Sequence, residues 1–197
     1  MQQWADVGTF LLEEATADLG ATGDIRPCML AFDGERPLFA AFVRSFGRGG
    51  YADPLIELLA LAGGLDADRL ALSLGGRAWS FADPIPPVVD GLGDLRQRVL
   101  CTLTVDGGGA TAVATSRIRP FTVAGGRVSW GDEVVTDAGE GWTVEALQLA
   151  VQRRSLLRCD VGQARRQARR CVELGHLLAL APDVVADLGL ERWETAG

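Results

Sequence analysis

The stretch "RQRVLCTLTVDGGGATAVATSRIRPFTVAGGRVSW", residues 96–130, decides the fold. It contains the short apolar runs RQRVLCTLTV, ATAVATSRI and FTV…RVSW, with glycine-rich breaks at Gly107–Gly109 and Ala124–Gly126. Apolar runs of this length, bounded by glycine turns, are typical of antiparallel strands joined by hairpins. We therefore predict an antiparallel meander over these residues.

A second pair of strands is predicted upstream, in "RPCMLAFDGERPLFAAFVRSF", residues 26–46. Two apolar runs flank Asp33-Gly34, the dipeptide best suited to a two-residue hairpin turn. Pro37 lacks an N–H group, so the start of the second strand should lie at a sheet edge or an unpaired end. A further strand is predicted in RLALSL, residues 69–74, and its connection to the hairpin through a helix could form one parallel pair.

The spacing of apolar residues predicts helices on both sides of the strands. They cover residues 3–19, 54–62, 143–158 and 162–180, with a short turn after Pro182. Because strands and helices are partly segregated, we predict an α+β fold: a mostly antiparallel sheet of about five to six strands with packed helices and a C-terminal helical hairpin. Residues 1–142 form the sheet domain, and residues 143–197 pack on it as one structural domain.

The glycines of Gly47-x-Gly49-x-x-Ala52 have the spacing of a dinucleotide-binding turn. However, Asp53-Pro54 follows at once, and a residue before proline is disfavoured in helical conformation, so Asp53 is predicted to be the N-cap. Its carboxylate would occupy the free N–H groups and repel a phosphate. The motif therefore predicts a corner between a strand and a helix.

A weaker possibility is a small-anion site at the same corner. The guanidinium groups of Arg44 and Arg48 and the backbone of Gly49 and Gly50 could hold an anion beside the helix start. Alternatively, the two arginines are solvated and pair with nearby acids, as isolated surface charges commonly do.

The sequence supplies little for catalysis or metal binding. It has one histidine, His176, and no G-x-S-x-G nucleophile motif. On a regular helix, Cys171 and His176 would point about 140° apart, too far for a direct pair. We predict no metal site and no cofactor, and we assign no catalytic residue. The four cysteines form no C-x-x-C pair: Cys28, Cys101, Cys159 and Cys171.

The net charge is −7, and all 19 basic residues are arginine, a bias typical of a GC-rich bacterial genome. The first 20 residues lack the basic-then-apolar pattern of a secretory signal, and no apolar run reaches the roughly 18 residues of a membrane span. We therefore expect a bacterial cytoplasmic protein that does not bind membranes.

The charge is distributed unevenly. Residues 1–150 carry 11 Arg against 20 Asp and Glu, a net of −9, whereas residues 151–175 carry seven Arg against two acids, a net of +5. These arginines either face the protein's own acidic sheet or bind a partner. The candidate partner-binding residues are Arg154, Arg158, Arg165, Arg166, Arg169 and Arg170.

The loop "AWSFADPIPPVVDGLGD", residues 78–94, is the other candidate contact surface. Trp79, Phe81, Ile85 and Pro86-Pro87 concentrate apolar and stiff residues where a solvent loop would normally be polar. Either the loop folds back as a cover for the core, or it contacts a partner with a preorganised shape.

We expect a non-enzymatic cytoplasmic protein-interaction module, a regulatory, adaptor or assembly component, that binds an acidic protein or a second copy of itself. The alternative is a small-molecule enzyme or sensor that binds a phosphorylated ligand near Arg44 and Arg48. A third possibility is a nucleic-acid-binding accessory protein, which the acidic remainder of the chain and the lack of aromatic residues among the arginines disfavour.

Overall fold

The fold was analysed in a computed structural model that describes residues 3–47, 50–78, 96–108, 111–138 and 141–190. Its strands are β1 (Cys28–Asp33), β2 (Arg36–Phe42), β3 (Arg69–Ala78), β4 (Gln97–Asp106), β5 (Val113–Ala124), β6 (Arg127–Trp130), β7 (Val134–Asp137) and β8 (Leu177–Leu180). Its helices are the 3-10 turn η1 (Trp4–Asp6), α1 (Val7–Thr22), α2 (Ala52–Gly64), α3 (Trp142–Gln152), α4 (Arg154–Leu157), α5 (Val161–Glu173) and α6 (Pro182–Asp187).

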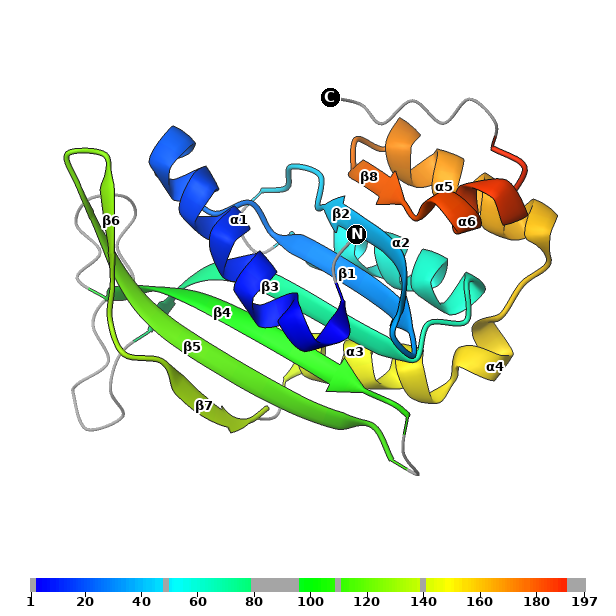
Figure 1. The fold of residues 1–197 in the computed structure, drawn as a ribbon, viewed down its shortest axis with the longest axis horizontal. Helices are drawn as coiled ribbons and strands as arrows, with labels where there is room; N and C mark the ends of the chain where they lie inside the picture. The colour runs from blue at the N-terminus through cyan, green and yellow to red at the C-terminus, as the bar shows by residue number, and fades with distance from the viewer. Residues whose placement is uncertain (1–2, 48–49, 79–95, 109–110, 139–140, 191–197) are drawn as a thin grey trace.

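The strands form one curled sheet in the order β6-β5-β4-β3-β1-β2-β8, with β7 also paired to β5 (Figure 1). Every pairing is antiparallel, which confirms the predicted α+β class and the meander. The sheet has eight strands instead of about five to six. The suggested parallel pair is wrong, because β1 lies between β2 and β3.

The predicted C-terminal helical hairpin is also wrong. The helix expected over residues 162–180 ends at Glu173, and residues 177–180 form β8, which pairs with β2. Gly175 has a φ of 101°, a conformation that L side chains rarely adopt, and it separates the helix from the strand.

The N-terminal hairpin follows the prediction with a shifted turn. Gly34 and Glu35 occupy the two turn positions, and Gly34 has a φ of 58°. Pro37 pairs with Phe32 at a register shift, and β8 pairs only with residues 39–42 of β2. Pro37 therefore lies where its missing N–H breaks no bond to the outer strand, as predicted.

The start of α2 corrects the predicted cap. The N-cap is Tyr51, and Asp53 lies inside the first turn without capping. Pro54 is accommodated there because the first four N–H groups of a helix have no partner within it. The first N–H donated along the helix is that of Leu55, to the carbonyl of Tyr51.

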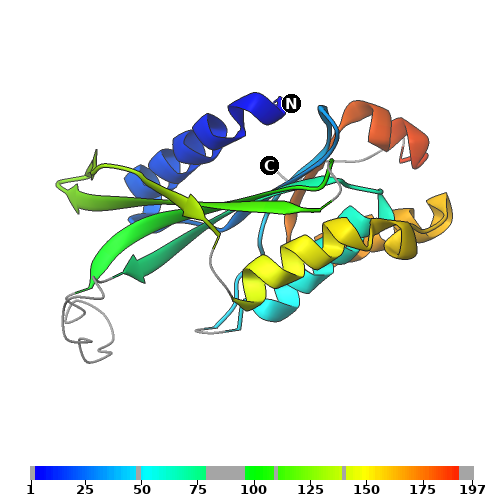
Figure 2. The ribbon, with the colours of Figure 1, turned by 90° about the horizontal axis from the view of Figure 1, so that it is seen from below.

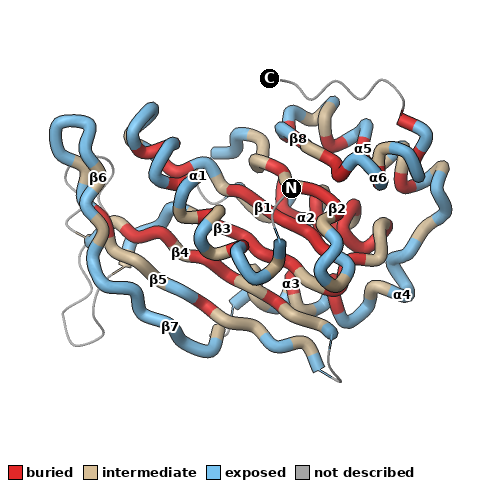
Figure 3. The backbone as a smooth tube through the Cα atoms, in the orientation of Figure 1, coloured by how far each residue is buried: buried red, intermediate tan, exposed pale blue. Residues whose placement is uncertain are grey.

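Helices cover both faces of the sheet. Figure 2 shows α1 on one face and α2 and α3 on the other. The strands and the inner sides of these helices contain most of the buried residues (Figure 3). The larger core cluster joins Leu58 of α2 with Leu147 of α3 and Ala168 of α5, so the described part of the C-terminal segment shares its core with the sheet.

Candidate functional site

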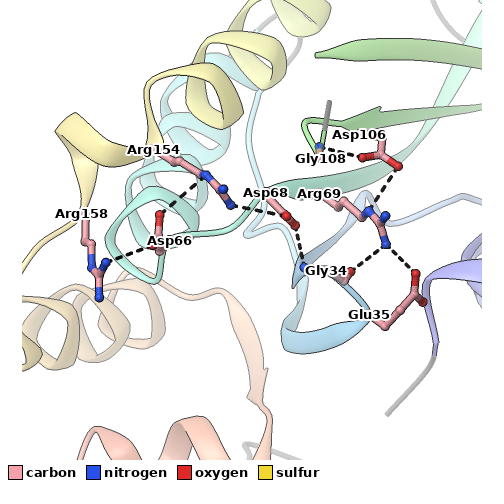
Figure 4. A network of polar contacts seen from close by, with 9 residues as sticks. All are labelled: Gly34, Glu35, Asp66, Asp68, Arg69, Asp106, Gly108, Arg154 and Arg158. Atoms are coloured by element: carbon pink, nitrogen blue, oxygen red, sulfur yellow. Dashed lines mark hydrogen bonds and ion pairs between the residues drawn. The ribbon is translucent and has the colours of Figure 1, made fainter. Parts of the chain in front are cut away.

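Two of the arginines proposed for partner binding are held by acids of the same chain. Arg154 lies 3.4 Å from Asp68 and 3.9 Å from Asp66, and Arg158 lies 3.3 Å from Asp66 (Figure 4). Asp68 also accepts a hydrogen bond from the Gly34 N–H at 2.7 Å. These contacts fix α4 to the link between α2 and β3.

The same network continues across the end of the sheet through one arginine of β3. Arg69 donates to the carbonyl of Gly34 at 3.0 Å and lies 3.2 Å from a carboxylate oxygen of Asp106 (Figure 4). The other oxygen of Asp106 accepts the Gly108 N–H at 2.9 Å. The acids in these turns therefore have structural partners within the chain.

The arginines of α5 are placed differently. Arg165 donates to the Leu188 carbonyl at 2.5 Å, whereas Arg166, Arg169 and Arg170 are exposed. Within the described residues, these three make no ion pair, so they face solvent and not the acidic sheet. The opposite side of α5 is buried through small residues: Ala164, Ala168 and Cys171.

A groove with mostly apolar walls lies on the same helical layer. It is formed by α2, α3 and α4 and has a volume of about 590 Å³. Leu149 is 55% exposed and Leu156 is 75% exposed, and both line it. The other lining residues are Ile56, Leu59, Ala60, Trp142, Glu145, Ala146, Ala150, Arg153 and Leu157.

The sequence reasoning missed this groove, although a signal was present. The buried face of α3 consists of Leu147, Ala150 and Val151. Leu149 falls outside that face, yet it is a large apolar residue. A large apolar residue on the outer side of an amphipathic helix could have indicated that this side also forms a contact surface, in addition to the side buried in the core.

One arginine of the anion site predicted near Gly49 and Gly50 forms an ion pair that the sequence did not predict. The Nε and Nη2 atoms of Arg44 donate hydrogen bonds to the two carboxylate oxygens of Glu57, at 2.9 Å each. Gly50 donates its N–H to the Gly47 carbonyl at 2.9 Å in a local turn. Arg44 is therefore engaged by a carboxylate, which leaves the corner with less positive charge than predicted.

Glu57 also joins this pair to the only histidine of the chain. His176 is fully buried, its Nε2 lies 2.8 Å from Glu57 Oε2, and its Nδ1 accepts the Arg44 backbone N–H at 3.1 Å. Because Nδ1 accepts, Nε2 carries the proton and donates to the carboxylate. The ring is thus neutral and links the segment that follows β2, helix α2 and the segment before β8.

The titration of this cluster follows from its contacts. Hydrogen bonds from Arg44 lower the pKa of Glu57 to about 2. Burial lowers the pKa of His176 below its ordinary value. Burial also raises the pKa of the Cys171 thiol to about 11 and that of Cys28 to about 12, so neither thiol is a nucleophile near neutral pH.

Several predicted site residues lie outside the described residues. They are Arg48, Gly49, Trp79, Phe81 and Ile85. Among the residues that are described, no group of three or more His, Cys, Asp or Glu side chains could hold a metal ion. No helix within the described ranges has the length and apolar character needed to cross a bilayer.

The candidate functional site is therefore the outer surface of the helical layer, which carries an apolar groove between α2, α3 and α4 and, on α5, three arginines that make no ion pair with the described residues. Comparison with known proteins gives no match to a family model, a curated protein or a solved structure.

Proposed function

We propose that this chain is a protein-interaction module whose groove between α2, α3 and α4 binds the apolar face of an amphipathic helix on an acidic partner protein. The observation that supports this most is the exposure of Leu149 and Leu156 in one groove. Single exposed leucines are ordinary on a protein surface. Contiguous apolar residues in a groove between helices are a common docking surface for a helix.

The charges around the groove support an acidic partner. Arg153 lines the groove and makes no ion pair with the described residues. Helix α5 packs against α2 and so belongs to the same helical layer. Its exposed arginines are Arg166, Arg169 and Arg170. Complementary charges at the rim of an apolar interface steer association and fix orientation more than they add affinity.

A second copy of this chain fits the groove less well. In a two-fold symmetric dimer the same patch meets itself, so Arg153 and the α5 arginines would face like charges. A helix with leucines at positions i, i+3, i+4 and i+7 and glutamates on both flanks meets the apolar floor and the basic rim together.

The test uses a defined peptide as the probe. A labelled amphipathic peptide with this leucine and glutamate pattern is titrated with the protein, and fluorescence anisotropy reports binding. A scrambled peptide of the same composition is the reference. The double variant Leu149→Glu/Leu156→Glu should weaken binding by about 30-fold or more, because it removes roughly 2 kcal/mol or more of apolar burial.

Val113→Glu is the matched control, since Val113 is a 60% exposed apolar residue outside the groove. It should leave the affinity unchanged. Equal binding of the ordered and scrambled peptides would overturn the proposal. So would a stable dimer in sedimentation velocity that the groove variant dissociates, because the occupant would then be a second copy.

A further inference from the structure

A second cavity lies on the face of the sheet opposite the helix-docking groove, between the N-terminal part of α1 and strands β4 and β5. Its volume is about 440 Å³, within the range of small-molecule sites. The buried apolar residues of α1 pack in two clusters with residues of β1, β3, β4 and β5. The lining residues are Trp4, Ala5, Val7, Gly8, Thr9, Leu12, Leu100, Thr102, Thr104, Arg117, Arg119 and Glu133.

The floor of this cavity is a polar strip on an otherwise apolar sheet face. Thr102 pairs with Arg117, and Leu100 pairs with Arg119, across β4 and β5. Side chains two residues apart on a strand point to the same face, so Thr102 and Thr104 lie beside the two arginines. Burial of a polar group costs free energy unless the group makes a hydrogen bond.

The hydrogen bonds of the strip are incomplete. Glu133 accepts from Arg117 at 3.0 Å and from Arg119 at 3.3 Å. Arg119 Nε is buried and has no hydrogen-bond partner among the described residues. Within the same described part of the chain, the hydroxyls of Thr102 and Thr104 make no hydrogen bond, so two residues that line the cavity have unused hydroxyl groups.

The charge of the lining selects the ligand. Two guanidinium groups oppose one carboxylate, so the lining carries one surplus positive charge. A single carboxylate on the ligand neutralises that surplus, and an arginine fork matches its geometry. Trp4, Val7 and Leu12 offer an apolar wall on the α1 side, which suits a short hydrocarbon body.

We propose that the cavity between α1 and the β4–β5 strip binds a small monocarboxylate with an apolar body. Arg117 and Arg119 bind the carboxylate, the hydroxyls of Thr102 and Thr104 donate to it, and the hydrocarbon packs against α1. Glu133 accepts hydrogen bonds from both arginines and so competes with the ligand, and the lining keeps one surplus positive charge that the ligand's carboxylate balances. This site is separate from the helix-docking groove, because the two lie on opposite faces of the sheet.

The test compares three probes by titration calorimetry and by the shift in melting temperature: octanoate, the neutral octanamide, and inorganic phosphate. Octanoate should bind about tenfold or more tightly than octanamide, because charge-assisted hydrogen bonds are stronger than neutral ones. Inorganic phosphate, which lacks an apolar body, should bind more weakly than octanoate.

Variants separate this site from a general effect on folding. Arg119→Gln should weaken octanoate binding by about tenfold and leave octanamide unchanged. Thr102→Val keeps the shape of the side chain and should weaken octanoate binding without loss of stability. Glu133→Gln should strengthen octanoate binding, because it removes the competing carboxylate. Arg127→Gln is the control, an exposed arginine of β6 outside the cavity.

The proposal is overturned if octanoate and octanamide bind equally, or if neither binds. It is also overturned if Arg119→Gln and Arg127→Gln have the same effect. Tighter binding of phosphate than of octanoate would identify an inorganic-anion site and contradict the monocarboxylate. The groove variant Leu149→Glu/Leu156→Glu should bind octanoate normally, so failure of one proposal leaves the other standing.

Discussion

On acidification, the free energy of unfolding of this protein should fall in two stages, and replacing Glu57 by Gln should remove one of them. The glutamine oxygen can still accept the Nε2–H of His176, so the variant should fold. It loses the charge that pairs with Arg44. The change therefore tests the electrostatic part of the cluster separately from its packing.

The magnitude follows from the pKa of Glu57, which is about 2 in the folded protein against an ordinary value of 4.5. At about 1.4 kcal/mol per unit this difference is worth roughly 3 kcal/mol. The Glu57 side chain is 21% exposed. Solvent therefore screens the pair, and we expect the variant to lose about 2 kcal/mol near neutral pH.

The change of the free energy of unfolding with pH depends on two titrating groups, Glu57 and His176. Glu57 has a lowered pKa, so its contribution is present above 4.5 and is lost as the pH falls toward 2. His176 also has a lowered pKa, and its neutral ring stabilises the fold above its ordinary pKa of 6.5. The free energy of unfolding should therefore fall in two stages on acidification, and Glu57→Gln should abolish the more acidic stage.

Urea unfolding followed by circular dichroism, at several pH values between about 7 and 3, measures this directly. Glu13→Gln is the control, since Glu13 is exposed on α1 and forms no ion pair with the described residues. An unchanged acid stage in Glu57→Gln, or an equal loss in Glu13→Gln, would refute the reasoning.

Four further predictions concern packing, charge and thiol reactivity. Gly107→Ala should destabilise the fold by about 1–3 kcal/mol in urea unfolding, because its Cβ would lie 2.9 Å from the Asp68 carbonyl and overlap Val151. Gly20→Ala should instead stabilise it by about 0.5–1 kcal/mol, since nothing lies within 4 Å in α1. The triple reversal Arg166→Glu/Arg169→Glu/Arg170→Glu should leave the melting temperature nearly unchanged, because none of the three makes an ion pair with the described residues; a large loss would show that they stabilise the fold. Cys28 and Cys171 should react with a thiol reagent at about pH 8 only after unfolding, because burial raises both pKa values well above the solution pH; rapid reaction in the native state would contradict their burial.

The parts of the fold that sequence reasoning could predict are those set by local signals. Glycine turns and short apolar runs fix the meander, and the Asp33-Gly34 pair places the hairpin within one residue. The β8 strand escaped because Leu177–Leu180 continues an apolar run that also suits a helix. Its pairing with β2, far away in the sequence, decides the conformation, and no local pattern reports such a contact.

The candidate site was predictable only in part, for a similar reason. The concentration of positive charge on α5 could be read from the sequence, and three of its arginines are exposed, whereas Arg165 bonds to the Leu188 carbonyl. Which arginines have partners could not be read, because Asp66 and Asp68 are more than 80 residues from Arg154. The pairing of Arg44 with Glu57 could not be predicted either, because it depends on how α2 packs beside the segment that follows β2.

The position of β8 has a consequence for synthesis on the ribosome. The last of the described strands, β8, pairs with β2, and His176 beside it is the final member to reach the Glu57 cluster. A nascent chain that ends before residue 176 lacks both β8 and His176, so it exposes the outer edge of β2 and leaves Glu57 with only Arg44 of its two side-chain partners. Unpaired strand edges invite pairing with other chains. Stalled or truncated copies should therefore aggregate more readily than the full chain, and the edge of β2 is the segment through which they would do so.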